Sequence, residues 1–377
     1  MRRRGAAPRM PGPFETRTVT LPVSLFIRGL QLVDIGRFDS FDSAVAAGLE
    51  LLTRSESAMS ERLKGAGNSY GQQGARPRAS PAGLPLTAEV QSPHARLPRA
   101  PREAVLTSSK ASPSRSAWPI LGFTAARILP MKAVLRGIAE AAVGQPSPLL
   151  DLGSLRSQLG VEALAWRAAL EAVDDQRRLA RGERLTTGFP SFARDGERSV
   201  RRFLDAYLGT FYSDGRVAGA PAYVGFVDMN MNDQGGRVGL TAPGLRFAQL
   251  PNSVFDRGEA RFPPFSPEEA DFYIRHVASA HLAEAEHMGE YLHLLRQRPG
   301  VDRDAAGSAM RRFYVRFWTP NNLTPDMVNS LRMSVHSRCQ ELGLAVADHD
   351  GRTAGYRITE LGERTLSSLQ SLESIPS

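Results

Sequence analysis

The feature that most constrains the fold of this chain is the stretch from residue 55 to residue 117. It is rich in Ser, Pro, Ala, Gly and Arg and holds few large apolar residues. Such a composition cannot bury enough apolar surface to offset the entropy of ordering the chain, so it predicts a flexible linker. The linker leaves a short N-terminal part and a long C-terminal part, and each must build its own core.

Charge is distributed along the chain in the same divided way. The net charge is +8, and residues 1–117 carry all of this excess, whereas residues 118–377 are neutral. Residues 1–13 are rich in Arg, Pro and Gly and predict a disordered basic arm. The sequence has no run of about 18 apolar residues, which predicts a cytoplasmic protein with no membrane partner. The single cysteine, Cys339, excludes an intramolecular disulfide framework.

Residues 14–54 predict one strand and two helices. Positions 16–22 alternate, with Arg17, Val19 and Leu21 on one face. The other face carries the threonines Thr16, Thr18 and Thr20. A helical pattern then ends at Gly36, and Ser40 can cap a second helix. A unit this small cannot fold alone, and its unpaired strand needs a partner, so the pattern predicts a dimer.

Two segments carry a family pattern. Thr18-Val19-Thr20-Leu21-Pro22 matches its strand, and residues 36–45 match its turn and second helix. On the basis of these segments, residues 14–54 resemble the ribbon-helix-helix family of DNA-binding proteins. The resemblance implies a homodimer whose two-stranded ribbon enters the major groove. It also implies that Thr16, Thr18 and Thr20 contact DNA.

Two C-terminal segments share one pattern, two short alternating strands around a Gly/Asp/Asn turn, which predicts a hairpin. They lie at residues 223–246 and 344–364. Each continues as Thr-x-x-Gly-x-Arg, from Thr241 and from Thr359, where the Thr can cap the next helix. We interpret the two segments as an internal duplication.

Helices followed by such a hairpin and a Thr-x-x-Gly helix resemble the winged-helix family. The expected fold class is therefore mainly α with small β hairpins (α+β), with a ribbon-helix-helix, a disordered linker and tandem winged-helix domains. The expected C-terminal divisions are a helical, possibly degenerate winged helix at 118–195, a winged-helix-like domain at 196–265, a helical connector at 266–299 and a winged-helix domain at 300–372.

The helix predicted from Thr324-Pro325 to about Leu342 has an apolar face. In winged-helix proteins the corresponding helix lies in the major groove, and the wing touches the DNA backbone or the minor groove. The resemblance thus implies DNA contacts by helix residues Asn329, Arg332, His336 and Arg338, and phosphate contacts by wing residues Arg352 and Arg357.

The sequence holds few signs of catalysis. It has no phosphate-binding loop with Lys-Ser/Thr and no Gly-x-Ser-x-Gly motif. Four histidines, His276, His281, His287 and His293, lie among glutamates, but their spacings of five and six residues do not share one helix face. A solvated, salt-bridged helix face is the favoured interpretation, with a metal site as the alternative. We therefore expect a non-enzyme with no cofactor and no metal.

The leading functional hypothesis is a dimeric transcriptional regulator that binds double-stranded DNA and associates with the nucleoid. An alternative is a DNA-associated accessory protein of plasmid partition, replication or mobile-element maintenance, whose winged helices bind a protein partner. A metal-dependent enzyme centred on residues 276–293 is a third, weaker hypothesis. The two regulatory modules would gain affinity from being tethered together.

Overall fold

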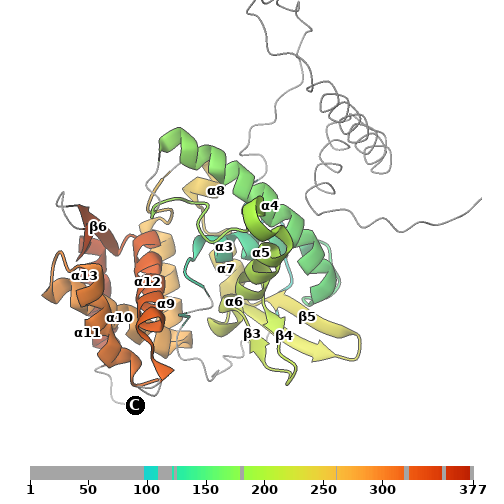
Figure 1. The fold of residues 1–377 in the computed structure, drawn as a ribbon. Helices are drawn as coiled ribbons and strands as arrows, with labels where there is room; N and C mark the ends of the chain where they lie inside the picture. Colours follow the sequence, from blue (N-terminus) through green and yellow to red (C-terminus); the bar gives the residue numbers. More distant parts are fainter. Residues whose placement is uncertain are drawn as a thin grey trace, which may run out of the picture. The chain divides into compact units, whose positions relative to one another are not determined.

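A computed structural model describes the C-terminal part of the chain. The described residues are 97–108, 121–122, 125–178, 182–259, 261–317, 322–349 and 354–373. The predicted arm and ribbon-helix-helix, with Thr16, Thr18 and Thr20, lie outside them, and so does Arg352. Two compact units divide the chain, at 1–85 and 86–377, and the second holds all described residues (Figure 1).

The described residues are mainly helical, with small antiparallel sheets, which confirms the expected α+β class. The helices are α3 (Leu129–Ala141), α4 (Leu152–Arg177), α5 (Phe192–Tyr207), α6 (Ala220–Tyr223), α7 (Ala242–Gln249), α8 (Ser253–Arg257), α9 (Pro267–Ala280), α10 (Leu282–Gln297), α11 (Arg303–Tyr314), α12 (Pro325–Glu341) and α13 (Glu360–Glu373). The strands are β1 (Leu150–Asp151), β2 (Thr210–Phe211), β3 (Val217–Ala218), β4 (Val227–Asn232), β5 (Gly235–Leu240), β6 (Ala345–His349) and β7 (Ala354–Ile358). None of these helices is long and apolar enough to cross a membrane.

The first repeat, residues 129–249, runs from α3 to α7 around one sheet. The strand order is β1-β5-β4, with Leu150 opposite Val238 and Val227 opposite Leu240. Helix α3 packs against α7, and α4 packs against α5. The buried side chains of α3, α4 and β5 form a continuous apolar core.

The second repeat, residues 282–373, runs from α10 to α13 in a similar order, without the β2–β3 hairpin and α6 that the first repeat has between α5 and β4. Strands β6 and β7 form the hairpin, with Ala345 opposite Ile358. Val301, just before α11, bridges to Tyr356 of β7, in the place that β1 takes beside β5. Helix α10 packs against α13, and α11 packs against α12. Both predicted hairpins are therefore confirmed, and each belongs to a larger repeated unit.

In both repeats a threonine side chain joins the two ends of the hairpin by a hydrogen bond, which we call the threonine latch. Thr241 Oγ1 donates to the Gly225 carbonyl, and Thr359 Oγ1 donates to the Gly343 carbonyl, each at 2.7 Å and across 16 residues. Both glycines have φ of +72°, a conformation that side chains disfavour. The threonines also cap their helices by accepting from Gly244 N–H at 3.2 Å and from Gly362 N–H at 3.0 Å. Repetition to this level of detail supports the duplication read from the sequence.

The domain boundaries differ from those expected. The boundary at residue 195 falls inside one sheet, because β1 pairs with β5. The expected connector, 266–299, divides at His281 into α9 and α10, and α10 packs on α11, α12 and α13. The local sequence patterns predict the hairpins. They do not predict the strand and helix, distant in the sequence, that complete each unit.

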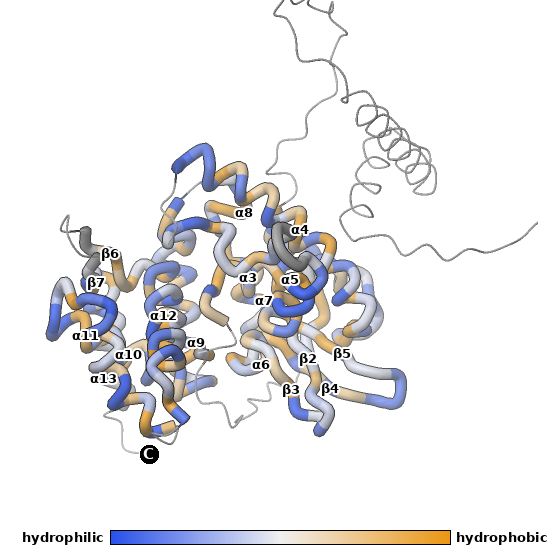
Figure 2. The backbone as a smooth tube through the Cα atoms, viewed as in Figure 1, coloured by the Kyte–Doolittle hydropathy of each residue, from blue (hydrophilic) through white to orange (hydrophobic). Residues whose placement is uncertain are grey.

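Part of the expected linker, residues 97–108, is described and packs on the folded unit. Leu97 is buried in the core of the second unit, and Val105 packs against that core. Ser108 N–H donates to the Leu240 carbonyl at 2.8 Å, and Ser108 Oγ donates to Asp228 Oδ2 at 2.5 Å. Residues 97–108 therefore belong to the folded unit. Figure 2 shows the hydrophilic residues gathered on outer helices and at the tip of the β4–β5 hairpin.

Candidate nucleic-acid interface

Helix α12, the expected groove-reading helix, forms as predicted. Thr324 caps it by accepting from Met327 N–H at 3.2 Å, Pro325 occupies its first turn, and Gly343 follows its end. Its apolar face is buried as expected. On its polar side, however, Arg332, His336 and Arg338 are also buried, whereas Asp326 and Met333 are exposed. The predicted DNA contacts of these three residues are wrong for this conformation, because other parts of the protein cover them.

Arg338 is held by a buried carboxylate and by the start of the first repeat. Its Nε donates to Glu284 Oε1 at 2.8 Å, and its NH1 donates to the Ala125 carbonyl at 2.7 Å. Burial alone would raise the pKa of Glu284. The Arg338 guanidinium, helped by His287 Nδ1 3.7 Å away and by a hydrogen bond from Leu121 N–H, instead lowers that pKa to about 2.

Glu341, at the end of α12, makes a second connection to the first repeat. Its Oε2 accepts from Ile128 N–H at 2.5 Å and from Leu129 N–H at 3.2 Å. These N–H groups begin α3, so a side chain from α12 caps the N-terminus of a distant helix. Helix α12 is thus the joint between the two repeats.

His336 lies inside an aromatic cluster. Its Nδ1 is 2.7 Å from the Tyr291 hydroxyl, and its ring centroid is 3.9 Å from that of Tyr356. Burial, followed by the nearby charges of Arg332 and Arg127, lowers the pKa of His336 to about 3. The imidazole is therefore neutral at physiological pH and shares a hydrogen bond with the Tyr291 hydroxyl.

Arg332 shares an acceptor with a second arginine. Its NH2 donates to Asn329 Oδ1 at 3.0 Å, and Arg303 Nε donates to the same oxygen at 3.1 Å. The Arg332 Nε and NH1 groups are buried without a hydrogen-bond partner. Asn329 is half-buried and Arg357 is exposed. Of the predicted C-terminal DNA contacts that are described, these two remain accessible.

Helix α5 presents basic side chains to solvent. Phe203, Leu204 and Tyr207 are buried on its inner face, whereas Arg201 and Arg202 are exposed. Both arginine side chains therefore lie where a ligand can reach them. Strands β2 and β3 and the short helix α6 separate α5 from the β4–β5 hairpin, whereas α12 is followed directly by β6.

The β4–β5 hairpin has two different faces. Met231 pairs with Gly236 and is 56% exposed, and a Cβ on Gly236 would lie 2.9 Å from the Phe211 ring. Because side chains alternate along a strand, Asn230 lies on the other face, opposite Arg237. Arg237 NH2 donates to Gln234 Oε1 at 2.6 Å. The tip therefore offers amide and guanidinium groups that can bind base edges or phosphates.

The histidine cluster does not converge on one point. His276 Nε2 is 2.6 Å from the Val224 carbonyl, His281 Nδ1 accepts from Glu284 N–H at 3.3 Å, and His287 Nε2 is 3.0 Å from the Tyr314 hydroxyl. No group of three or more His, Cys, Asp or Glu side chains that could hold a metal ion occurs among the described residues. Burial raises the pKa of the Cys339 thiol, so this group stays protonated.

No protein-family model, curated protein or solved structure matches this chain.

Proposed function

We propose that this protein binds double-stranded DNA and that its two repeats are winged-helix modules. The observation that carries the proposal is the repeated order of helix, short strand or bridge, helices, hairpin and Thr-x-x-Gly helix. Winged-helix modules place the helix before the hairpin in the major groove and the hairpin on the backbone or minor groove. In the first repeat the β4–β5 tip is the matching hairpin. The short helix directly before it, α6, is buried, so we assign the helix contact to the exposed arginines of α5.

In this proposal the second repeat offers fewer residues to DNA than the first repeat. Arg332, His336 and Arg338 of α12 are buried, so the described residues that remain for DNA contact in the second repeat are Arg357 on the hairpin and the half-buried Asn329 of α12. Sequence readout then falls to the first repeat and to residues 14–54, the proposed ribbon-helix-helix dimer. Such a protein fits a dimeric transcriptional regulator associated with the nucleoid.

The test is a mobility-shift titration of the full chain against duplex DNA at several salt concentrations. The double variant Arg201→Ala/Arg202→Ala should bind more weakly. Because each lost phosphate contact lowers the slope of log K against log salt by about 1, the slope should fall by about 2. A full chain that fails to retard any duplex at low salt would refute the proposal.

The matched control removes two exposed arginines from outside the repeats, Arg257→Ala/Arg275→Ala. These side chains form surface ion pairs with Glu259 and Asp271, and the variant has the same net charge as the test variant. Its slope of log K against log salt should be nearly the same as that of the wild-type chain. If control and test lose affinity equally, binding depends on net charge and α5 is not the contact.

The proposed dimer has its own test. In the strand expected at residues 16–22, Leu21→Asp would bury an unpaired charge in the dimer core. Sedimentation should then show a monomer, whereas a variant that stays dimeric would contradict the ribbon-helix-helix assignment.

One observation favours a second candidate function, an accessory protein whose C-terminal repeat makes protein contacts. That observation is α12, whose would-be reading face already makes an intramolecular protein contact through Arg338 and Glu341. This candidate predicts a small ratio of specific to random-duplex affinity and a protein partner that remains bound during purification. A regulator instead requires a large affinity ratio.

A further inference from the structure

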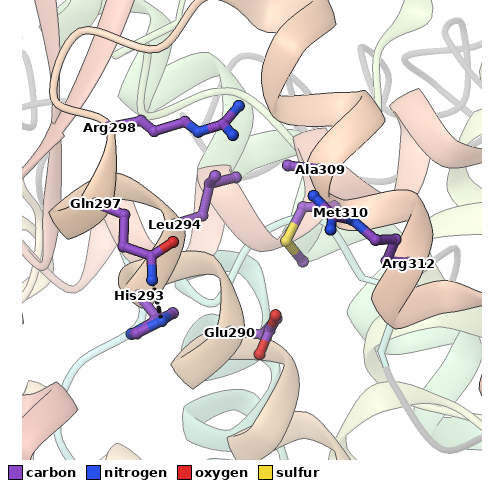
Figure 3. Close-up of a pocket in the computed structure, with 8 residues that line it drawn as sticks. All are labelled: Glu290, His293, Leu294, Gln297, Arg298, Ala309, Met310 and Arg312. Atoms are coloured by element: carbon purple, nitrogen blue, oxygen red, sulfur yellow. Dashed lines mark hydrogen bonds between the residues drawn. The ribbon is translucent and has the colours of Figure 1, made fainter.

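A pocket of about 250 Å³ opens between α10 and α11 in the second repeat (Figure 3). Its walls are Glu290, His293, Leu294, Gln297, Arg298, Ala309, Met310 and Arg312. The volume lies near the lower end of the range for small-molecule sites, so only a small ligand fits. It is separate from the surfaces proposed above for DNA.

The pocket combines an apolar wall with a charged rim. Leu294 and Met310 are buried and Ala309 is half-buried, whereas Glu290, Arg298 and Arg312 are exposed. This division suits a ligand with an apolar body and a charged end. Methionine adapts its shape to varied apolar groups, so Met310 would accept more than one such body.

The three charged groups of the rim have no ion-pair partner among the described residues. A neighbouring arginine and glutamate differ from them because they form an ion pair with each other, with Arg316 NH2 3.1 Å from Glu286 Oε2. The rim thus offers two free guanidinium groups and one free carboxylate. A guanidinium fork matches a carboxylate in geometry and charge, and the Glu290 carboxylate matches an ammonium group.

His293 and Gln297 add a neutral acceptor to the pocket. Gln297 Nε2 lies 2.7 Å from His293 Nε2, and Arg296 NH2 lies 3.1 Å from His293 Nδ1. The Gln297 amide oxygen points away from the imidazole ring (Figure 3), which leaves it as an acceptor for a ligand.

We propose that this pocket binds a small zwitterion, namely a free α-amino acid with an apolar side chain. Its carboxylate would be held by Arg298 and Arg312, its ammonium group by Glu290, and its side chain by Leu294 and Met310. This ligand class satisfies every free group of the rim. Inorganic phosphate would pair with the arginines but would face the Glu290 carboxylate with a like charge.

The test is calorimetric titration of the full chain with L-leucine, L-methionine and L-phenylalanine. At least one should bind saturably. Two analogues of leucine isolate its charged ends, because N-acetyl-leucine lacks the ammonium group and leucinol lacks the carboxylate. Each analogue should bind at least about tenfold more weakly, since each loses a charge-assisted hydrogen bond.

Three variants test the rim, Arg298→Gln, Arg312→Gln and Glu290→Gln. Each should weaken binding of the best amino acid about tenfold or more, with an unchanged melting temperature because the side chains are exposed. The matched control is Arg316→Gln, which removes a charge from α11's C-terminal flank outside the pocket and should leave binding unchanged.

Absence of saturable binding by all three amino acids would overturn the proposal. So would equal losses in Arg312→Gln and Arg316→Gln, or binding of inorganic phosphate where no amino acid binds. The titration contains no DNA, so its failure leaves the proposed function standing, and failure of DNA binding leaves this site standing.

Discussion

The Arg338–Glu284 pair lies inside the second repeat, and each partner also bonds the segment before α3, Arg338 at the Ala125 carbonyl and Glu284 at Leu121 N–H. Both side chains are fully buried, and Arg338 NH2 lies 2.6 Å from Glu284 Oε1. A buried ion pair contributes little net stability when intact, because both charges have lost their hydration. Removing one partner is different, since the remaining charge stays buried without compensation.

We therefore expect Arg338→Met to lower the free energy of unfolding by about 3–5 kcal/mol. Adding Glu284→Gln removes the orphan charge while keeping an oxygen for Leu121 N–H. The double variant should then lose less free energy of unfolding than the sum of the losses in the two single variants. Urea denaturation of all four proteins measures the coupling, and strictly additive losses would contradict a paired arrangement.

His336 makes stability depend on pH. Its pKa is about 3 in the folded protein, well below the ordinary histidine value of 6.5, so the unfolded chain binds a proton more readily. Its contribution to stability is present above pH 6.5 and is lost as pH falls from there towards 3. In His336→Asn the amide oxygen can keep the Tyr291 hydrogen bond, and the variant should lose less stability between about pH 7.5 and pH 5.

Urea midpoints at the two pH values measure this difference. Burial also lowers the pKa values of His276, His281 and His287, but these residues are present in both proteins and their contributions cancel in the comparison. Equal losses in wild type and variant would show that His336 is accessible to protons in the folded state.

At the scale of elements, α12 shows what local sequence can and cannot predict. Its bounds follow from Thr324-Pro325, Gly343 and the apolar spacing, which all act within the helix. Its surroundings do not, because polar side chains on its second face find partners more than 200 residues away, such as the Ala125 carbonyl bound by Arg338. In the sequence, polar residues that hydrogen-bond to distant backbone groups cannot be told apart from polar residues on a solvent-exposed helix face.

The Thr-x-x-Gly helices predict two equivalent mutants. At Gly244 a Cβ would clash with the Phe226 carbonyl, and at Gly362 it would clash with the Leu344 carbonyl. Both contacts involve backbone, which cannot move aside as a flexible side chain can. Gly244→Ala and Gly362→Ala should each lower the free energy of unfolding by about 1–3 kcal/mol or more.

The matched control is Gly307→Ala in α11, where the nearest atom to a new Cβ is Val328 Cγ1 at 3.9 Å. There alanine should be neutral or should stabilise by up to about 1 kcal/mol, because it favours helix. Thermal unfolding ranks the three proteins. A control as damaged as the other two would mean that the close carbonyl contacts are not the cause.

At the scale of the whole molecule, residues 97–108 change where the folded unit begins. The average composition of residues 55–117 hid Leu97 and Val105, which are enough to anchor a short segment. The Pro98 carbonyl also accepts from Arg136 NH1 at 2.9 Å, inside the core. A fragment that starts at residue 109 should therefore unfold at a lower temperature than one that covers residues 86–377.

Calorimetry of the two fragments gives the measurement. The longer fragment keeps a partner for Arg136, whereas the shorter one leaves part of this buried guanidinium without its hydrogen bond, which costs about 1–3 kcal/mol. Identical melting temperatures would show that residues 97–108 rest on the unit without stabilising it.

The pocket between α10 and α11 marks a further limit of sequence analysis. Glu290 and His293 were visible as neighbours on one helix, but Arg312 comes from the next helix, and its side chain reaches the pocket only because α10 and α11 pack together. Helical spacing predicts which residues share a face. It does not predict which face of a second helix will lie opposite, and the chemistry of the pocket depends on that pairing.

The threonine latch has a consequence for the order of folding. The first turn of a helix is its slowest step, because several residues are fixed for one hydrogen bond. In each repeat that turn is anchored by a threonine whose hydroxyl also bonds a glycine carbonyl across the hairpin. The helix therefore gains its anchor when the hairpin closes, and the two form as one cooperative unit. Amide exchange should release α7 with β4–β5, and α13 with β6–β7, at matching rates within each pair.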